Sequence, residues 1–135
     1  MANQNASKGL NITLWVAQIL LGALNMMAGS MKLFQPIEAL TQTLPWVNET
    51  PSSLVRFIGL SELAGGLGLL LPSLLRIKPG LTPIAAIGLV AVQVLATAFH
   101  ISRGETSVIG INLVFAGIAA FIAWGRMKRA PIMAK

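Results

Sequence analysis

The sequence predicts an all-α fold: a transmembrane four-helix bundle that forms a single domain over residues 1–135. Hydrophobic residues make up 55% of the chain and charged residues only 10%, whereas soluble domains carry about 25% charged residues. Four apolar runs also approach the ~20 residues that a helix needs to cross hydrocarbon; they cover residues 10–33, 54–75, 81–101 and 108–124. All four must be helical, because lipid leaves no water for unpaired backbone groups.

The first run, residues 10–33, is expected to stay in the protein as a span. It is too long for a cleaved signal peptide and contains polar residues. Its polar and small residues recur at spacings of four and three, so they share one helical stripe: Gln18, Gly22, Asn25, Gly29 and Lys32. In lipid such a stripe should face other helices, where close approach and hydrogen bonds favour packing.

The connection from Phe34 to Ser53 predicts a short helix on the membrane surface. Ile37, Leu40 and Leu44 recur at helical spacing, and Trp46 follows. An aromatic side chain often anchors such a segment at the interface. An ordinary loop is the alternative reading of this short pattern.

The second run, residues 54–75, carries the costliest residue in the sequence. A carboxylate such as Glu62 costs roughly 2.5 kcal/mol or more inside a bilayer. Gly59, Glu62 and Gly66 form one stripe, and a second stripe of Ser61, Gly65 and Gly68 lies beside it. The second stripe serves a homodimer as readily as the bundle.

The third and fourth runs repeat the pattern more weakly. Gln93, Thr97 and His100 share a face of the third run. The fourth run carries Asn112 followed by small residues at helical spacing: Ala116, Ala119 and Ala123. Each helix therefore offers one small and polar face, and the simplest assembly turns all four faces inward.

Charges separate by side and predict the orientation. One side would hold both termini and the middle connection, with seven basic residues and no acidic one: Lys8, Arg76, Lys78, Arg126, Lys128, Arg129 and Lys135. The positive-inside rule then places both termini in the cytoplasm, in a multi-pass protein of the inner membrane. Since the basic residues lie at span ends and in connections, the net charge of +6 does not indicate nucleic-acid binding.

These patterns predict an outward-facing polar pocket. We expect Lys32, Glu62, Gln93, His100 and Asn112 to line it, with Glu62 about 12 Å below the start of its span at ~1.5 Å per residue. Pairing of Lys32 with Glu62 would lower the cost of burying either. The absence of cysteine rules out thiol redox chemistry and thiolate metal sites. No metal site is predicted, because the methionines near His100 are typical core residues.

Two segments resemble the DoxX-like family of small four-helix membrane proteins. Ala28-Gly29-Ser30-Met31-Lys32-Leu33 closes the first run, and a Gly-x-x-Glu-Leu-x-Gly-Gly segment covers Gly59 to Gly66. The resemblance extends from about Leu14 to Trp124. It implies that Lys32, Arg56, Glu62 and His100 are pocket residues, and Trp46 in the neighbouring connection completes the predicted ligand-binding set. It also implies roles as small subunits of quinone-linked oxidoreductases, in oxidative-stress complexes or as membrane chaperones.

Three functions stay open at this point. The first is an accessory subunit, not catalytic on its own, that binds a quinone-like ligand beside a partner oxidoreductase subunit. The second is a small dimeric exporter in which Glu62 exchanges protons for cations. The third is an assembly factor or chaperone that acts through the connection around Trp46. No resident cofactor is firmly implied; a quinone is the one candidate.

Overall fold

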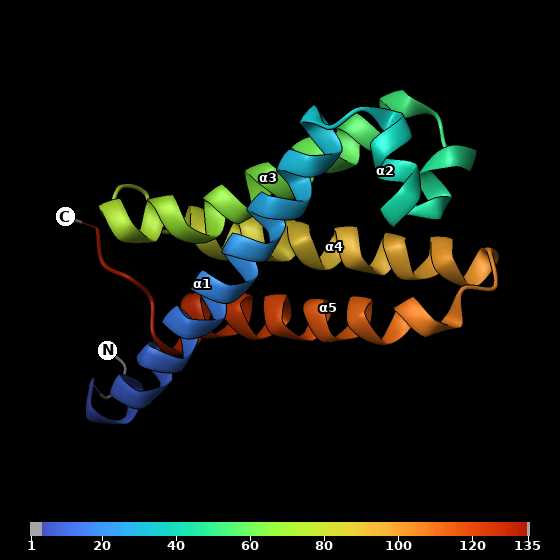
Figure 1. Cartoon of the computed structure of the whole chain (residues 1–135). Coiled ribbons are helices and arrows are strands. Elements are labelled where there is room, and N and C mark those ends of the chain that lie inside the picture. The colour runs from blue at the N-terminus through green and yellow to red at the C-terminus, as the bar shows by residue number, and fades with distance from the viewer. Residues whose placement is uncertain (1–3, 135) are drawn as a thin grey trace.

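The computed structural model describes residues 4–134, and all of the regular secondary structure in that range is helical. Four long helices run back and forth, and shorter turns connect them (Figure 1). The long helices are α1 (Gln4–Phe34), α3 (Ser52–Leu75), α4 (Leu81–Ser102) and α5 (Ile109–Trp124). The short elements are α2 (Ile37–Thr43), the 3-10 turns η1 (Pro45–Glu49) and η2 (Thr106–Val108), and the π-helical turn η3 (Gly125–Arg129).

All four long helices are apolar and long enough to span a membrane. The candidate spans are Lys8–Phe34, Ser52–Leu75, Leu81–Ser102 and Thr106–Arg129, close to the predicted runs. Large apolar side chains cover the outside of the bundle; Phe34, for example, is 76% exposed and Leu95 70% exposed. Because water would not tolerate so much apolar surface, lipid must cover it. The chain is therefore a multi-pass membrane protein.

Glycines bring α1 and α3 into backbone contact. A Cβ atom added at Gly29 would lie 2.5 Å from the Leu63 nitrogen and 2.6 Å from the Gly59 oxygen. A Cβ at Gly66 would lie 2.7 Å from the Gly22 oxygen. Only glycine fits at these crossings, as the GxxxG type of membrane packing requires. The predicted inward stripes of the first two spans are confirmed.

The second stripe of α3 packs against α4. A Cβ at Gly65 would meet the Leu89 side chain at 2.5 Å, and one at Gly68 would meet the Ala85 Cβ at 2.6 Å. The stripe that was compatible with a dimer therefore packs within the chain. Next to it, α3 and α4 meet α1 and α5 in an apolar core formed by Leu21, Leu69, Ala86, Leu89, Ala119, Ile122 and Ala123.

The connection between α1 and α3 contains the predicted short helix. α2 begins directly after Pro36, and η1 begins at Pro45. Proline suits the start of a helix, because the N–H that it lacks would have no hydrogen-bond partner within the helix. Leu40 and Val47 are buried against Val55 of α3. This connection is therefore folded onto one end of the bundle, opposite the end that holds both termini (Figure 1). Its placement on a membrane surface stays a prediction.

Candidate functional site

A cavity of about 570 Å³ opens at the end of the bundle covered by α2 and η1. All four long helices and the connection around Trp46 contribute to its wall. The wall is mostly apolar, with side chains such as Phe57, Ile58, Phe99 and Phe115. Six of the seven residues predicted to bind a ligand line this cavity: Lys32, Trp46, Glu62, Gln93, His100 and Asn112.

Lys32 and Glu62 form an ion pair on the cavity wall. The Lys32 Nζ lies 2.6 Å from the Glu62 Oε1, and the two side chains are 12% and 9% exposed. The glycine crossing creates this pair, since a Cβ at Gly59 would lie 2.8 Å from the Lys32 Cβ. Close approach of α1 and α3 therefore places the two charges opposite each other. The predicted pairing is confirmed.

Arg56 is the predicted residue that does not line the cavity. Its guanidinium Nη1 donates hydrogen bonds to the Lys32 carbonyl at 2.8 Å and to the Gln35 carbonyl at 2.7 Å. These carbonyls belong to the last turn of α1 and the residue after it, where intrahelical donors run out. Arg56 thus caps the C-terminal end of α1 and holds the backbone of Lys32 in place. It lies next to the cavity but does not line it.

Two amide side chains of the cavity wall have buried atoms without a hydrogen-bond partner. These atoms are the Gln93 Oε1 on α4 and the Asn112 Nδ2 on α5. Gln93 as a whole is only 6% exposed. Buried polar atoms in folded proteins are nearly always hydrogen-bonded, so an unpartnered pair needs an explanation. Both residues line the same cavity, so a polar molecule bound there would lie next to these two side chains.

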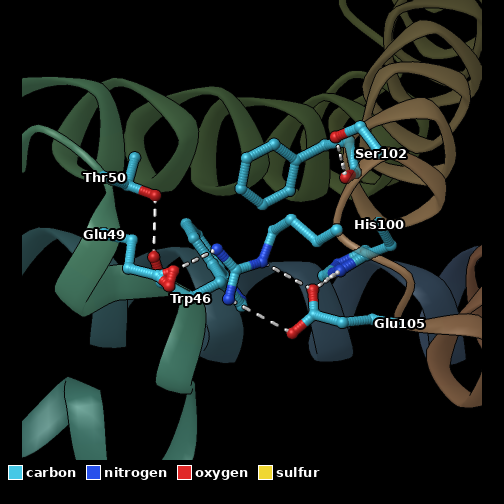
Figure 2. A network of polar contacts seen from close by, with 8 residues as sticks. Trp46, Glu49, Thr50, His100, Ser102 and Glu105 are labelled. Carbon is cyan, nitrogen blue, oxygen red and sulfur yellow. Dashed lines mark hydrogen bonds and ion pairs between the residues drawn. The ribbon is translucent and has the colours of Figure 1, made fainter.

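A charged network lies at the rim of the cavity, whose wall includes His100 and Glu105 (Figure 2). The Glu105 Oε1 lies 2.9 Å from the His100 Nδ1 and accepts a 2.8 Å bond from the Arg103 Nε. The Arg103 Nη1 reaches across to the Glu49 Oε2 at 2.8 Å. Gly104, with a φ of 73°, makes the tight turn that lets residues 103 and 105 meet. Arg103 thus joins Glu105, two residues away, to Glu49 of η1, a link that was not predicted from the sequence.

Electrostatics keep this rim charged. The hydrogen bond from Arg103, followed by the contact with His100, holds the pKa of the Glu105 carboxyl below its ordinary value of 4.5.

Trp46 packs edge-on against Phe99 at 5.7 Å and against His100 at 6.5 Å between ring centroids. The connection that carries Glu49 and Trp46 is thus attached to α4 by an aromatic cluster and to the turn after α4 by an ion pair.

A model of a known protein family matches the part of the chain that builds this site. The model of the DoxX-like family matches residues 16–122, which is most of the chain and includes both segments that carried the resemblance. The chain belongs to the DoxX-like family. No curated protein and no solved structure matches it. The residues of this DoxX-like protein therefore have to be interpreted from its own geometry.

A second polar cluster lies at the opposite end of this DoxX-like bundle. The Arg126 Nε donates to the Gln18 Oε1 at 2.6 Å, and the Gln18 Nε2 donates to the Leu69 carbonyl at 2.6 Å. Asn25 donates to Leu21 within its own helix. Gln18 and Asn25 are packing residues, as the sequence indicated. The burial of Arg126, which is 4% exposed, was not anticipated from its place among the basic residues.

Proposed function

We propose that this DoxX-like protein binds a quinone-like, lipid-soluble ligand in the cavity beside Glu62. The observation that carries the proposal is an apolar cavity of about 570 Å³ that contains an ion pair and two unpartnered amide atoms. Cavities of roughly 300–1,000 Å³ with apolar walls and a few converging polar groups are typical ligand sites. Membrane quinones combine an apolar body with polar oxygens, which matches this wall.

The polar residues supply the groups that such a ligand needs. The Lys32 ammonium and the unpartnered Asn112 Nδ2 can donate hydrogen bonds to ring carbonyls, whereas the unpartnered Gln93 Oε1 can accept one from the hydroxyl of a reduced ring. The Glu62 carboxylate can accept a hydrogen bond from the hydroxyl of a reduced ring. Lys32 and Glu62 come from α1 and α3, whereas Gln93 and Asn112 come from α4 and α5. A ring between the two helix pairs would therefore be held on both sides.

An accessory role in a membrane redox system fits these groups better than independent catalysis. Among the described residues, the cavity presents no activated nucleophile and no cluster of three or more metal-ligating carboxylates and histidines. Electrons would then have to come from a partner oxidoreductase subunit that shares the bound ligand. The charge asymmetry supports cytoplasmic termini in the inner membrane, with the cavity opening toward the outer face.

Trp46 provides a direct test, because it is the tryptophan that lines the cavity. Trp15 and Trp124 are the other two, and each lies near an arginine at the opposite end of the bundle. In a Trp15→Phe/Trp124→Phe variant, a short-chain quinone should quench Trp46 fluorescence saturably. The matched Trp46→Phe variant reports non-specific quenching in the detergent. Equal, non-saturating quenching in both variants would reject the proposal.

Gln93 and Asn112 separate ligand binding from folding. Replacement of either by leucine should weaken quinone binding roughly three- to tenfold, the effect of one net hydrogen bond. The same replacement should leave the stability of the empty protein unchanged or raised, because an unpartnered buried polar atom is removed. Gln42→Leu, an exposed amide on α2 outside the cavity lining, is the control and should leave affinity unchanged.

A proton-coupled exporter is the competing function, and the burial of Glu62 favours it. For exchange, a cationic substrate would have to displace Lys32 from a carboxylate only 2.6 Å away. Addition of a lipophilic cation to purified, unbuffered protein distinguishes the two functions. Proton release that depends on Glu62 would favour export, whereas no release together with saturable quinone quenching would favour the redox role.

A further inference from the structure

Positive charge gathers at the end of the bundle opposite the cavity. Among the residues that the structure describes, this end holds six cations: Lys8, Arg76, Lys78, Arg126, Lys128 and Arg129. Lys135, which was counted with them in the sequence, lies outside the described residues. All four glutamates of the chain, at positions 38, 49, 62 and 105, belong to the other half of the bundle or its connections.

Two hydrogen bonds bring three separate segments together at this end. The Arg76 Nε donates to the Met133 carbonyl at 2.8 Å, which joins the turn between α3 and α4 to the C-terminal tail. The Arg126 Nη1 donates to the Asn11 Oδ1 at 2.6 Å, which joins η3 to α1 one turn after Lys8. The cations therefore share one end of the folded protein (Figure 1).

Arg126 is a buried cation whose neighbours are neutral. Its acceptors are the Gln18 Oε1, the Asn11 Oδ1 and the Ala130 carbonyl, and its guanidinium lies 5.4 Å from the Trp15 ring. Its Nη2 is buried without a hydrogen-bond partner, and no carboxylate among residues 4–134 pairs with it. Burial of a charge without an opposite charge is costly. A nearby anion from outside the chain would reduce this cost.

Arg129 and Trp124 mark the depth at which such an anion would lie. The Arg129 guanidinium lies 5.9 Å from the centre of the Trp124 ring, and Trp124 is 46% exposed. Tryptophan beside a basic residue at the end of a span is typical of the lipid headgroup level. The π-helical turn η3 presents Lys128 and Arg129 there, both exposed, while Arg126 points inward.

We propose that this basic end binds the phosphate headgroup of an anionic phospholipid. The exposed cations Lys8, Lys128 and Arg129 contact the headgroup. Arg126 holds η3 and the C-terminal tail in the arrangement that presents them, and it adds its uncompensated charge to the local field. Basic clusters next to membrane spans attract anionic lipids, and each cation near the surface raises the binding affinity roughly fivefold. This inference does not depend on the ligand of the cavity.

The test titrates the full-length protein in neutral detergent with phosphatidylglycerol or with phosphatidylcholine and follows the thermal unfolding midpoint. We expect phosphatidylglycerol to raise the midpoint more than phosphatidylcholine, and 0.5 M salt to remove most of the difference, as exposed charges are screened. A Lys8→Gln/Lys128→Gln/Arg129→Gln variant should bind phosphatidylglycerol on the order of a hundredfold more weakly. Its midpoint in phosphatidylcholine should be unchanged, which shows that it folds.

A charge-preserving control completes the design: Lys8→Arg/Lys128→Arg/Arg129→Lys should retain the response to phosphatidylglycerol. Equal responses to the two lipids, or a glutamine variant that keeps the full phosphatidylglycerol response, would overturn the proposal. Inorganic phosphate that reproduces the shift would show a free anion site in place of a lipid site. A soluble polyglutamate that reproduces it would show an acidic protein surface as the partner. Either of these two results would also overturn the lipid assignment.

Discussion

At the scale of single residues, the Lys32–Glu62 pair explains how this membrane bundle tolerates a carboxylate. The two side chains are at least 88% buried and only 2.6 Å apart. Removal of one partner from such a pair leaves an uncompensated charge, which typically costs about 3–5 kcal/mol. Replacement of both partners by neutral side chains removes the charges together and is often neutral.

Substitution of both residues therefore tests the pairing. Glu62→Gln or Lys32→Met alone should lower the free energy of unfolding by up to about 3–5 kcal/mol. The unfolding midpoint in detergent and the folded yield should fall with it. The double change should restore most of the loss. Strictly additive losses in this double-mutant cycle would show that the two side chains do not depend on each other.

The rim carboxylate Glu105 gives a prediction about pH. Because Arg103 and His100 hold its pKa below 4.5 in the folded protein, the charged form contributes stability above pH 4.5. That contribution is lost as the pH falls through the lowered folded pKa. Wild type should thus lose more stability than Glu105→Gln between pH 5 and strongly acidic pH. Thermal unfolding over that range provides the comparison, and parallel curves would contradict it.

At the scale of elements, the backbone contact between α1 and α3 positions the site. These helices approach closely because glycines face each other, and the approach places Lys32 opposite Glu62. By contrast, α4 and α5 contribute the two amides without a comparable crossing at the cavity. Backbone contact therefore fixes the geometry of the α1–α3 half of the site.

A glycine substitution tests this role of the crossing. Gly29→Ala should destabilise the fold by about 1–3 kcal/mol, since its Cβ would meet backbone atoms of α3 that cannot move aside. It should also weaken quinone binding by separating Lys32 from Glu62. Gly88→Ala on α4 is the matched control, with nothing within 4 Å of the new Cβ, and it should be neutral or slightly stabilising. Equal stability of the two variants would contradict the account.

Some features of these elements could be predicted from the sequence, and others depend on how the chain folds back on itself. The stripes through Gly29 and Glu62 were predicted because helical periodicity and the cost of a buried carboxylate are local properties of the sequence. The ion pair between Glu49 and Arg103 joins residues 54 positions apart, and it depends on how the connection folds back, which periodicity does not encode. The inward turn of Arg126 likewise depends on the π-helical turn η3, whose sequence resembles an ordinary basic flank.

At the scale of the whole molecule, the two ends differ in chemistry. One end has an apolar cavity with an ion pair, unpartnered amides and a rim joined to η1. The other end has six described cations without an acidic side chain. The proposed lipid contact would anchor the basic end at the headgroup level of one leaflet. The cavity would then open toward the opposite leaflet, where a lipid-soluble ligand can enter.

The central claim is that the cavity beside Glu62 holds a quinone-like molecule. The most direct measurement is solvent extraction and mass spectrometry of the protein purified from membranes in mild detergent. We expect a quinone retained at close to one per folded chain in wild type, and strongly depleted in Gln93→Leu/Asn112→Leu protein of equal stability. A folded wild type that copurifies empty and takes up no added quinone would contradict the claim.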